Sequence, residues 1–437
     1  MKSKISVFTA SAIVVANMIG TGVFTSVGFQ LAAVQNTWSI LILWLAGGLI
    51  ALFGAFAYSE LGTHFKESGG DYIYLSRVFH PILGYLSAWA GLTVGFSAPI
   101  ALAAMAFTTY LAPLGLRDNA GFAIGLIILI GFMHSLTIRH SSRFQNFATG
   151  IKILFILVLI FFGFAFTGDT TSALNFSDSW QREVGSTGFA VSMVYVAFAY
   201  TGWNAAAYVV GEIKEPSKNL PKVLIGSTFF VSIIYVLFQF VLLRNAGTDQ
   251  LRGREDVTFI AFENLLGSTG GKWVSIFIAL QLMATISSYL WVGSRVTWAL
   301  AREHKLWSPL ARRNKQGIPV AAIWLHVIIA VIFTVTGSFE KILLYAGFVL
   351  QLMASLTVAA SIFIKTNKAV FRSPFKPVLQ VAFLIFNAWV LIYMLIDRPL
   401  ESLLGIGILI MGSILYFFDT PVVVKPSSSS PVGVDAS

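Results

Sequence analysis

Apolar stretches long enough to cross a bilayer recur along most of the chain, and this pattern restricts it to a helical membrane fold. A helix crosses the bilayer core with about 20 apolar residues. Lipid leaves unpaired backbone groups unsatisfied, which excludes exposed loops and open sheet edges. Of the 437 residues 57% are hydrophobic and only 11% are charged, whereas roughly a quarter of a soluble domain is charged. The sequence therefore predicts an all-α integral membrane protein.

We predict twelve transmembrane helices within a single transporter domain that covers residues 1–418. The first apolar run follows Lys2 and Lys4, as in a signal peptide, but it has no small-residue cleavage site, so we count it as a span. The Ser/Pro-rich stretch 419–437 is expected to be a disordered cytoplasmic tail. The predicted spans are 6–33, 38–62, 82–112, 120–138, 145–167, 186–212, 221–244, 272–300, 319–337, 341–364, 377–396 and 400–418.

Lysine and arginine residues predict the orientation of these spans. With the N-terminus inside, the inner segments hold more than twice as many of these residues as the outer ones, for example Arg312, Arg313 and Lys315. The positive-inside rule therefore places both termini in the cytoplasm, and we expect an inner (plasma) membrane protein. The net charge of +10 follows from this topology, so we expect the lipid bilayer, and no nucleic acid, as a partner.

A glycine pair interrupts the first predicted span. Gly20, Thr21 and Gly22 lie in the stretch ANMIGTGVF, at a depth where an unwound backbone is tolerated only in a protein interior or beside water. Glycine permits unusual backbone angles and the close approach of a ligand. Amides freed there would begin a half-helix whose partial positive charge suits a carboxylate. Close helix packing is an equally good explanation of this motif taken alone.

A second interruption, Tyr200-Thr201-Gly202, lies near the middle of the sixth predicted span. Corresponding breaks in two halves of a membrane protein indicate an inverted repeat with a site at the bilayer midplane. We therefore predict repeat one over about 6–167 and repeat two over about 186–364, with two further helices at 377–418. We detect no residue-level similarity between the two halves. The prediction of a repeat therefore rests on the matching positions of the two breaks.

Four segments resemble amino-acid permeases of the amino acid–polyamine–organocation superfamily. The segment FAYTGWNAAAYVVGEIKEPSKNLPKVL (198–224) is most similar to the L-type neutral amino-acid branch. That branch commonly has a second glycine where Thr201 stands, so the resemblance implies a tighter pocket here. The segments are NMIGTGVF (17–24), AYSELGTHFKESGGDYIYLSRVFHPILGYLSAW (57–89), FAYTGWNAAAYVVGEIKEPSKNLPKVL (198–224) and GSRVTWALAREHKLWSP (293–309).

The resemblance implies a leucine-transporter-like, five-plus-five inverted repeat with discontinuous helices 1 and 6. It also implies that the α-carboxylate of an amino acid meets backbone amides at the first break, and that the α-ammonium meets carbonyls at the second. Light subunits of the branch use a cysteine to join a heavy chain; this chain has none, so we expect no disulfide-linked heavy chain. The candidate substrate contacts are Ile19, Gly20, Thr21, Gly22, Phe198, Ala199, Tyr200, Thr201, Gly202, Trp203, Asn204 and Ser97.

Lys152 lies about two turns into the predicted span 145–167. An ionisable residue inside a span is functional by default, and a buried lysine can load and release a proton. The resemblance implies that it fills the room where sodium-driven relatives bind sodium. Alternatively, its head reaches the cytoplasmic interface. Its expected neighbours are carbonyls near Ala16 and Asn17 and the hydroxyls of Thr285, Ser287 and Ser288.

The predicted spans contain no acidic residue at mid-depth that could pair with a cationic substrate side chain, and Asn204 is neutral. A buried unpaired charge costs several kcal/mol, so a neutral amino acid is the expected substrate. Glu60 and Arg295, near the inner ends of spans, are predicted to form gating or topology pairs.

The sequence contains no motif that indicates enzymatic activity. There is no G-x-x-x-x-G-K loop, no nucleophile elbow and no cysteine, and the six histidines lack metal-ligand spacing. We expect no catalytic residue, no metal and no cofactor. The leading hypothesis is secondary transport of neutral L-amino acids by alternating access, coupled either to a proton or to exchange of another amino acid. Alternatives are a cationic amino-acid or polyamine transporter, or a non-transporting membrane sensor or scaffold.

Overall fold

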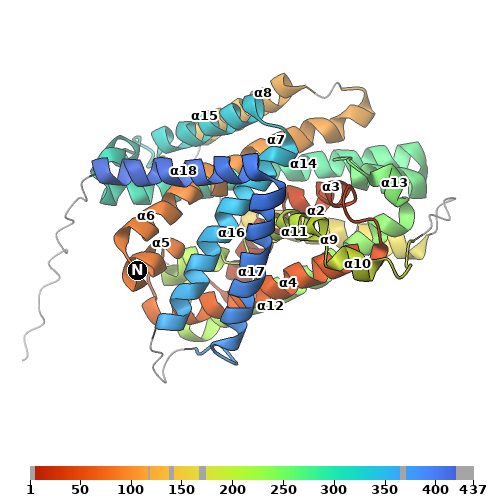
Figure 1. Ribbon diagram of the computed structural model, residues 1–437. Coiled ribbons are helices and arrows are strands. Elements are labelled where there is room, and N and C mark those ends of the chain that lie inside the picture. Colours follow the sequence, from red (N-terminus) through yellow and green to blue (C-terminus); the bar gives the residue numbers. More distant parts are fainter. Residues whose placement is uncertain (1–4, 117–118, 137–141, 167–173, 365–370, 420–437) are drawn as a thin grey trace, which may run out of the picture.

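The computed structural model describes residues 5–116, 119–136, 142–166, 174–364 and 371–419. Helices form almost all of this part of the chain (Figure 1). The only bridge between extended segments that the described residues form pairs Ile5 with Ile213. The all-α prediction is therefore confirmed. The predicted tail, Asp419 apart, lies outside the described residues.

The helices follow one another with short connections. Their bounds are α1 Val7–Met18, α2 Thr21–Thr25, α3 Val27–Gln30, α4 Thr37–Phe65, α5 Asp71–Val78, α6 Pro81–Ala90, η1 Gly91–Ser97, α7 Ala98–Leu111, η2 Ala112–Leu114, α8 Ala120–Leu136, α9 Ser142–Ala165, α10 Trp180–Val184, α11 Thr187–Ala199, η3 Ala205–Glu212, α12 Pro216–Asn245, α13 Thr248–Leu251, α14 Val257–Glu303, η4 Lys305–Ala311, α15 Val320–Thr336, α16 Phe339–Phe363, α17 Val378–Asp397 and α18 Pro399–Phe418.

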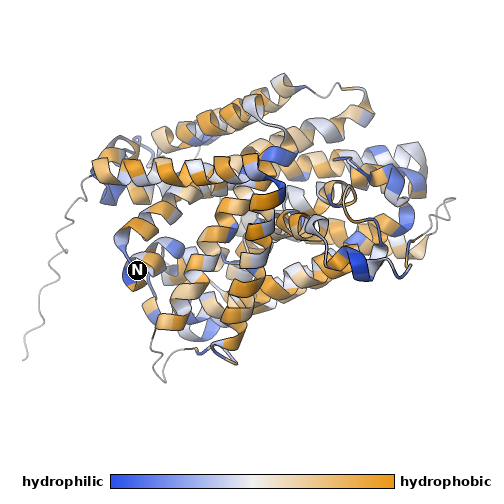
Figure 2. Ribbon diagram, viewed as in Figure 1, coloured by the Kyte–Doolittle hydropathy of each residue, from blue (hydrophilic) through white to orange (hydrophobic). Residues whose placement is uncertain are grey.

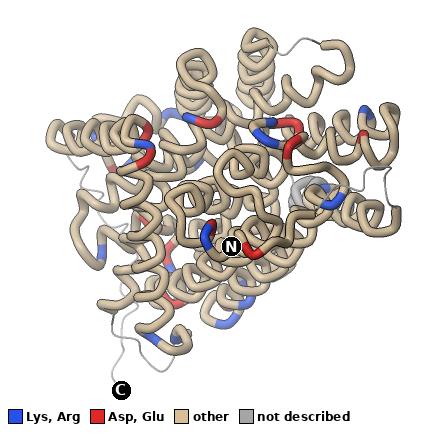
Figure 3. Tube along the Cα trace, turned by 45° about the vertical axis from the view of Figure 1, so that its right-hand side comes forward, with Lys and Arg blue, Asp and Glu red and all other residues tan. Residues whose placement is uncertain are grey.

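Seven helical stretches in the described part are long and apolar enough to cross a membrane: α4, the α6–α7 stretch, α12, α14, α16, α17 and α18. Shorter apolar helices, α1, α8, α11, α15 and the Thr149–Ala165 part of α9, accompany them. Hydrophobic residues predominate along the helices (Figure 2), and many of them are exposed, among them Leu403, Ile410 and Phe417 of α18. Charged residues are sparse along the helices (Figure 3). These features belong to an integral membrane protein, whose apolar outer surface faces lipid.

Two predicted spans differ from the observed helices. The span expected at 272–300 is the second part of α14, which begins at Val257 and bends at Gly267, where φ is +73°. Only glycine adopts such an angle without strain, so the helix changes direction there. The span expected at 82–112 contains a π-helical segment, η1, between α6 and α7.

Glu60 forms a buried ion pair near the end of α4. Lys376 donates from Nζ to Glu60 Oε1 over 2.8 Å and to the carbonyl of Ile364 over 3.2 Å, and the amide of Ser373 donates to Glu60 Oε2. The Glu60 side chain is fully buried and that of Lys376 is 11% exposed. The pair joins α4 to the segment before α17, which agrees with the structural pairing expected for Glu60.

Replacing Glu60 by glutamine should destabilise the protein strongly, because Lys376 keeps a buried charge without its partner. The expected loss is about 3 to 5 kcal/mol, measured as a lower unfolding temperature in detergent. The matched control is Glu67→Gln, which removes the half-exposed partner of Arg77 and should cost at most about 1 kcal/mol. Equal shifts for the two variants would contradict a structural role for the buried pair.

Candidate functional site

The first helix break separates α1 from α2. Helix α1 ends at Met18, Ile19 and Gly20 leave helical geometry, and the helix resumes at Thr21. Ser26 has helical angles and its amide donates to the carbonyl of Gly22, so α2 continues into α3 as one half-helix. The predicted interruption at the glycine pair is therefore present.

The second break follows α11, which ends at Ala199. Gly202 has φ +97° and the chain continues as the 3₁₀ segment η3. The two breaks touch each other at glycines: a Cβ on Gly22 would lie 2.7 Å from Cα of Ala199, and one on Gly202 would lie 2.7 Å from the carbonyl carbon of Asn17. Such distances leave no room for a side chain, so the breaks depend on glycine at both positions.

Tyr235 of α12 joins the ends of the two interrupted helices. Its Oη lies 2.5 Å from the carbonyl oxygen of Met18 and 3.1 Å from that of Ala199, the last residues of α1 and α11. The carbonyls at a helix end have no partner within the helix. One buried hydroxyl proton therefore serves both ends.

A small cavity of about 10 Å³ lies between the breaks, enough for about one water molecule. The first amides of α2 lack acceptors within their own helix and carry its positive end. They border a site suited to an anionic group. The cavity is lined by Asn17, Met18, Gly20, Thr21, Gly22, Pro99, Phe198, Ala199, Thr201, Thr285 and Tyr289.

The carbonyls expected to receive an ammonium group already have donors. Phe198 accepts from the amide of Thr201 over 3.0 Å and from its Oγ1 over 2.7 Å, and Ala199 accepts from Tyr235. A threonine hydroxyl commonly folds back onto a nearby backbone carbonyl. In this conformation Thr201 thus covers the end of α11.

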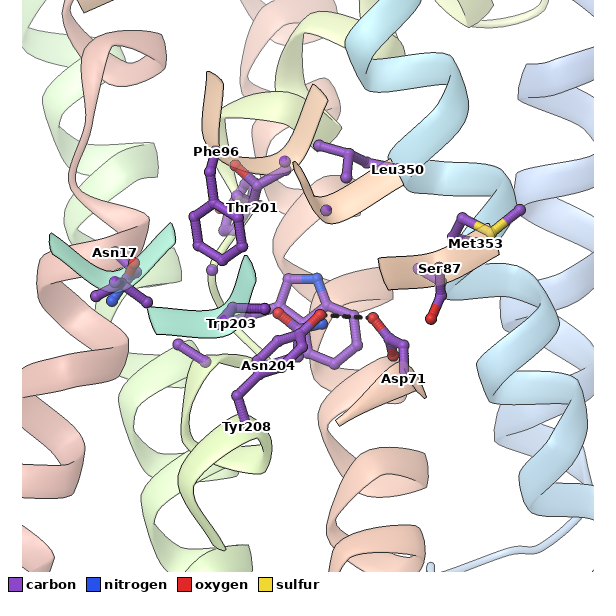
Figure 4. A pocket seen from close by; sticks show the side chains of 18 of the residues that line it. Asn17, Asp71, Ser87, Phe96, Thr201, Trp203, Asn204, Tyr208, Leu350 and Met353 are labelled. Atoms are coloured by element: carbon purple, nitrogen blue, oxygen red, sulfur yellow. Dashed lines mark hydrogen bonds between the residues drawn. The ribbon is translucent and has the colours of Figure 1, made fainter. Parts of the chain in front are cut away.

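A much larger cavity of about 610 Å³ adjoins the small one and shares Asn17, Phe198, Thr201 and Tyr289 with it. Figure 4 shows Asn17, Phe96 and Thr201 in one part of this cavity. Its lining reaches Ile5, at the N-terminal end of the described chain, and the exposed Ser68 and Glu212. The amide of Ile5 donates to the Glu212 carbonyl and the amide of Gly211 donates to Oγ of Ser68, so this part of the cavity lies beside the N-terminal segment. Tyr200, Gly202, Trp203 and Asn204 also line this cavity.

The opposite side, above α2 and α3, is closed. Tyr110 donates to the carbonyl of Phe24 over 2.6 Å, Gln239 donates to that of Val23 over 3.0 Å, and the amide of Gly253 donates to that of Gly28. Phe24 and Val23 are buried. The structure therefore represents a state in which the region of the breaks is approached from the N-terminal side.

Lys152 of α9 is buried beside the first break. Its Nζ donates to the carbonyl of Ile19 over 3.3 Å and to Oγ1 of Thr285 over 3.0 Å. Thr285 is an expected neighbour. The carbonyl contact is at Ile19 instead of Ala16 or Asn17, because α1 continues to Met18 and Ile19 is the first residue beyond it.

The other two hydroxyls expected beside Lys152 have different surroundings. Ser287 pairs with Nε2 of His134 over 2.8 Å, and Ser288 lines the large cavity. Successive residues of α14 point in different directions around the helix, so three hydroxyls that are close in sequence do not converge on one ammonium.

Ser97, a candidate substrate contact, lines neither cavity in this conformation. It is buried, donates to the carbonyl of Leu92 over 2.8 Å and lies 2.8 Å from Nδ1 of His326. The π-helical segment η1 turns Gly95 and Phe96 toward the large cavity instead. Periodicity analysis assumes 3.6 residues per turn and misses such a wide turn.

Sequence analysis also missed Asp71, which lines the large cavity from the first turn of α5. Tyr58 donates to its Oδ1, and Tyr208 donates to its Oδ2 over 2.6 Å. Burial raises the pKa of this carboxyl group, and the tyrosine hydrogen bonds oppose that shift. Asp71 follows two glycines in a segment between predicted spans, where the sequence analysis predicted no site. Both glycines have positive φ and turn α5 back into the protein.

The described residues contain no group of three or more histidine, aspartate or glutamate side chains that could hold a metal ion. Arg295 also lines the large cavity, where its guanidinium lies over the ring of Trp291 at 3.8 Å and donates to the Trp291 carbonyl. The expectation that Arg295 forms an ion pair is wrong for this conformation, since none of the ion pairs among the described residues includes it.

Two interrupted helices that meet beside a cavity open on one side of the molecule are features of a membrane transport protein. The chain belongs to the amino acid permease family, whose model matches residues 5–418. It is 29% identical to the large neutral amino acids transporter small subunit 2 of Mus musculus, over 95% of this chain and 81% of the relative. It is 27% identical to the Asc-type amino acid transporter 1 of Mus musculus, over 95% of this chain and 81% of the relative. The b(0,+)-type amino acid transporter 1 of Mus musculus is 24% identical to it, over 96% of this chain and 88% of the relative. A permease moves its substrate unchanged, so the protein is not an enzyme.

Gly202→Ala should disrupt the second break, because a side chain there would meet Asn17 and adopt a strained positive φ. We expect amino acid uptake into proteoliposomes to fall to background, with a stability loss of about 1 to 3 kcal/mol. The control is Gly226→Ala in α12, where nothing lies within 4 Å of an added Cβ. Normal uptake by Gly202→Ala would show that the break tolerates a side chain.

Proposed function

We propose that this protein is a secondary transporter of neutral L-amino acids that works by alternating access. The observation that carries the proposal is the contact between the two helix breaks beside a cavity open on one side. Relatives whose names specify large neutral and Asc-type amino acid transport support the substrate class. The absence of a mid-depth acidic residue from the predicted spans agrees with a neutral side chain.

The substrate carboxylate would bind the amides of Thr21 and Gly22 at the start of α2, where the helix end is positive. It would also bind the amide of Gly20, which must first leave the Met18 carbonyl to which it donates over 2.8 Å. The ammonium group would bind at the end of α11. For this, the Thr201 hydroxyl must rotate away from the Phe198 carbonyl and release an acceptor. Binding thus replaces a hydrogen bond within the protein by one to the substrate.

The proposed architecture has twelve transmembrane helices. Repeat one covers about 6–167, repeat two about 186–364, and two helices at 377–418 stand outside the repeats. Both termini would lie in the cytoplasm of a plasma membrane, so the large cavity would open inward. Alternating access would then close this mouth and open the side now sealed by Tyr110 and Gln239.

The position of Lys152 supports a coupling role, because its ammonium joins α9 to the first residue beyond α1 and to α14. Loss of its proton would weaken both contacts and favour rearrangement of the break. The energy source would be either this proton or exchange against a second amino acid. The b(0,+)-type relative and Asp71 in the cavity keep cationic amino acids as a second candidate substrate.

Purified protein in liposomes preloaded with alanine or leucine should accumulate the labelled form of the same amino acid in a counterflow experiment. Neutral amino acids should compete more strongly than arginine, because no carboxylate at the breaks would pair with the extra charge of the arginine side chain. Empty liposomes and the Gly202→Ala variant are the controls. Stronger competition by arginine than by leucine would favour the cationic alternative.

Lys152→Ala should lower uptake at least about tenfold and remove its dependence on pH between 5 and 8, because the break loses its charged tether. The matched control is Lys272→Ala, an exposed lysine of α14, which should leave both properties unchanged. A Lys152→Ala variant with the same rate and pH profile as the parent would reject the coupling role while leaving the binding site untouched.

A further inference from the structure

Asp71 is a buried carboxylate on the wall of the transport cavity, and the proposed substrate site at the breaks does not use it. Only 8% of the residue is exposed. Its two oxygens accept from Tyr58 of α4 and Tyr208 of η3. Among the described residues no lysine, arginine or histidine forms an ion pair with it. Its nearest stabilising groups are thus neutral hydroxyls.

A carboxylate can accept about four hydrogen bonds, so the two phenols leave lone pairs available. Burying a charge without a counterion is unfavourable. Arg295, the cationic side chain on this cavity wall, lies over Trp291 instead of pairing with Asp71. A cationic ligand that enters the cavity would therefore find Asp71 unneutralised.

The surroundings of Asp71 also suit an ammonium ion. Figure 4 shows Asp71, Trp203, Asn204 and Tyr208 on the wall of the same cavity, with Tyr208 hydrogen-bonded to Asp71. The rings of Trp203 and Tyr58 lie 4.7 Å apart. Aromatic faces attract ammonium groups, and amide oxygens accept their hydrogen bonds. The Asp71 carboxylate, the aromatic rings and the Asn204 amide together could bind a primary ammonium group.

We propose that Asp71, Trp203, Asn204 and Tyr208 form a second, ammonium-binding subsite at the N-terminal-side mouth of the cavity, separate from the helix breaks. This inference rests on the proposed function: an amino acid that moves between the breaks and this mouth binds there through its α-ammonium group. Because the subsite has no carboxylate-binding partner, it also accepts primary amines without a carboxylate. A substrate arriving from the opposite side reaches the breaks first.

The test compares KM for labelled amino acid on the two faces, using membrane vesicles of both orientations. Asp71→Asn should raise KM about tenfold on the N-terminal face, because an amide replaces a charged acceptor. KM on the opposite face should stay within about twofold. Glu67→Gln removes an exposed carboxylate four residues away and should change neither value. An unchanged KM on the N-terminal face, or equal increases on both, overturns the proposal.

Butylamine provides a second measurement on the unaltered protein. It should inhibit uptake from the N-terminal face only, and it should raise the unfolding temperature of the parent protein but not of Asp71→Asn. Inhibition from both faces, or none from either, overturns the subsite. If the parent fails to transport amino acids at all, the proposed function fails. The thermal shift with butylamine still decides the subsite in that case.

Discussion

The need to satisfy backbone hydrogen-bonding groups away from water is the constraint on which this structure depends. Two helices end in the protein interior, and their terminal carbonyls share the hydroxyl of Tyr235. Glycine at positions 22 and 202 lets the two ends touch. Because amides at the start of α2 remain available at the same place, the irregular backbone becomes a polar site inside an apolar protein.

The same constraint accounts for the asymmetry of the molecule. Beyond the breaks, side chains of α7 and α12 donate to the carbonyls of Phe24 and Val23 and hold α2 and α3 against the bundle. On the N-terminal side the bundle leaves a cavity of about 610 Å³. Lys152 contacts Ile19 between these regions, so one charged group contacts the backbone where the two helical halves meet.

Three buried ionisable groups differ in what neutralises them. Glu60 has Lys376, which makes it a structural pair. Lys152 has a carbonyl and a hydroxyl, and Asp71 has two phenols. A charge held by neutral dipoles can change partners at lower cost than one in a closed ion pair. This difference separates the groups suited to substrate handling from those that hold helices together.

The sequence by itself determined the membrane class, the helical content and the positions of both breaks, because apolar length and glycine placement are local properties that lipid makes decisive. It also identified Lys152 and its contact with Thr285. Only the tertiary structure decided that Asp71 faces the cavity and that Ser97 does not. A turn at two glycines and a π-helical segment rotate these residues away from the positions that regular periodicity predicts. Contacts between distant segments set those rotations, and a linear pattern does not contain them.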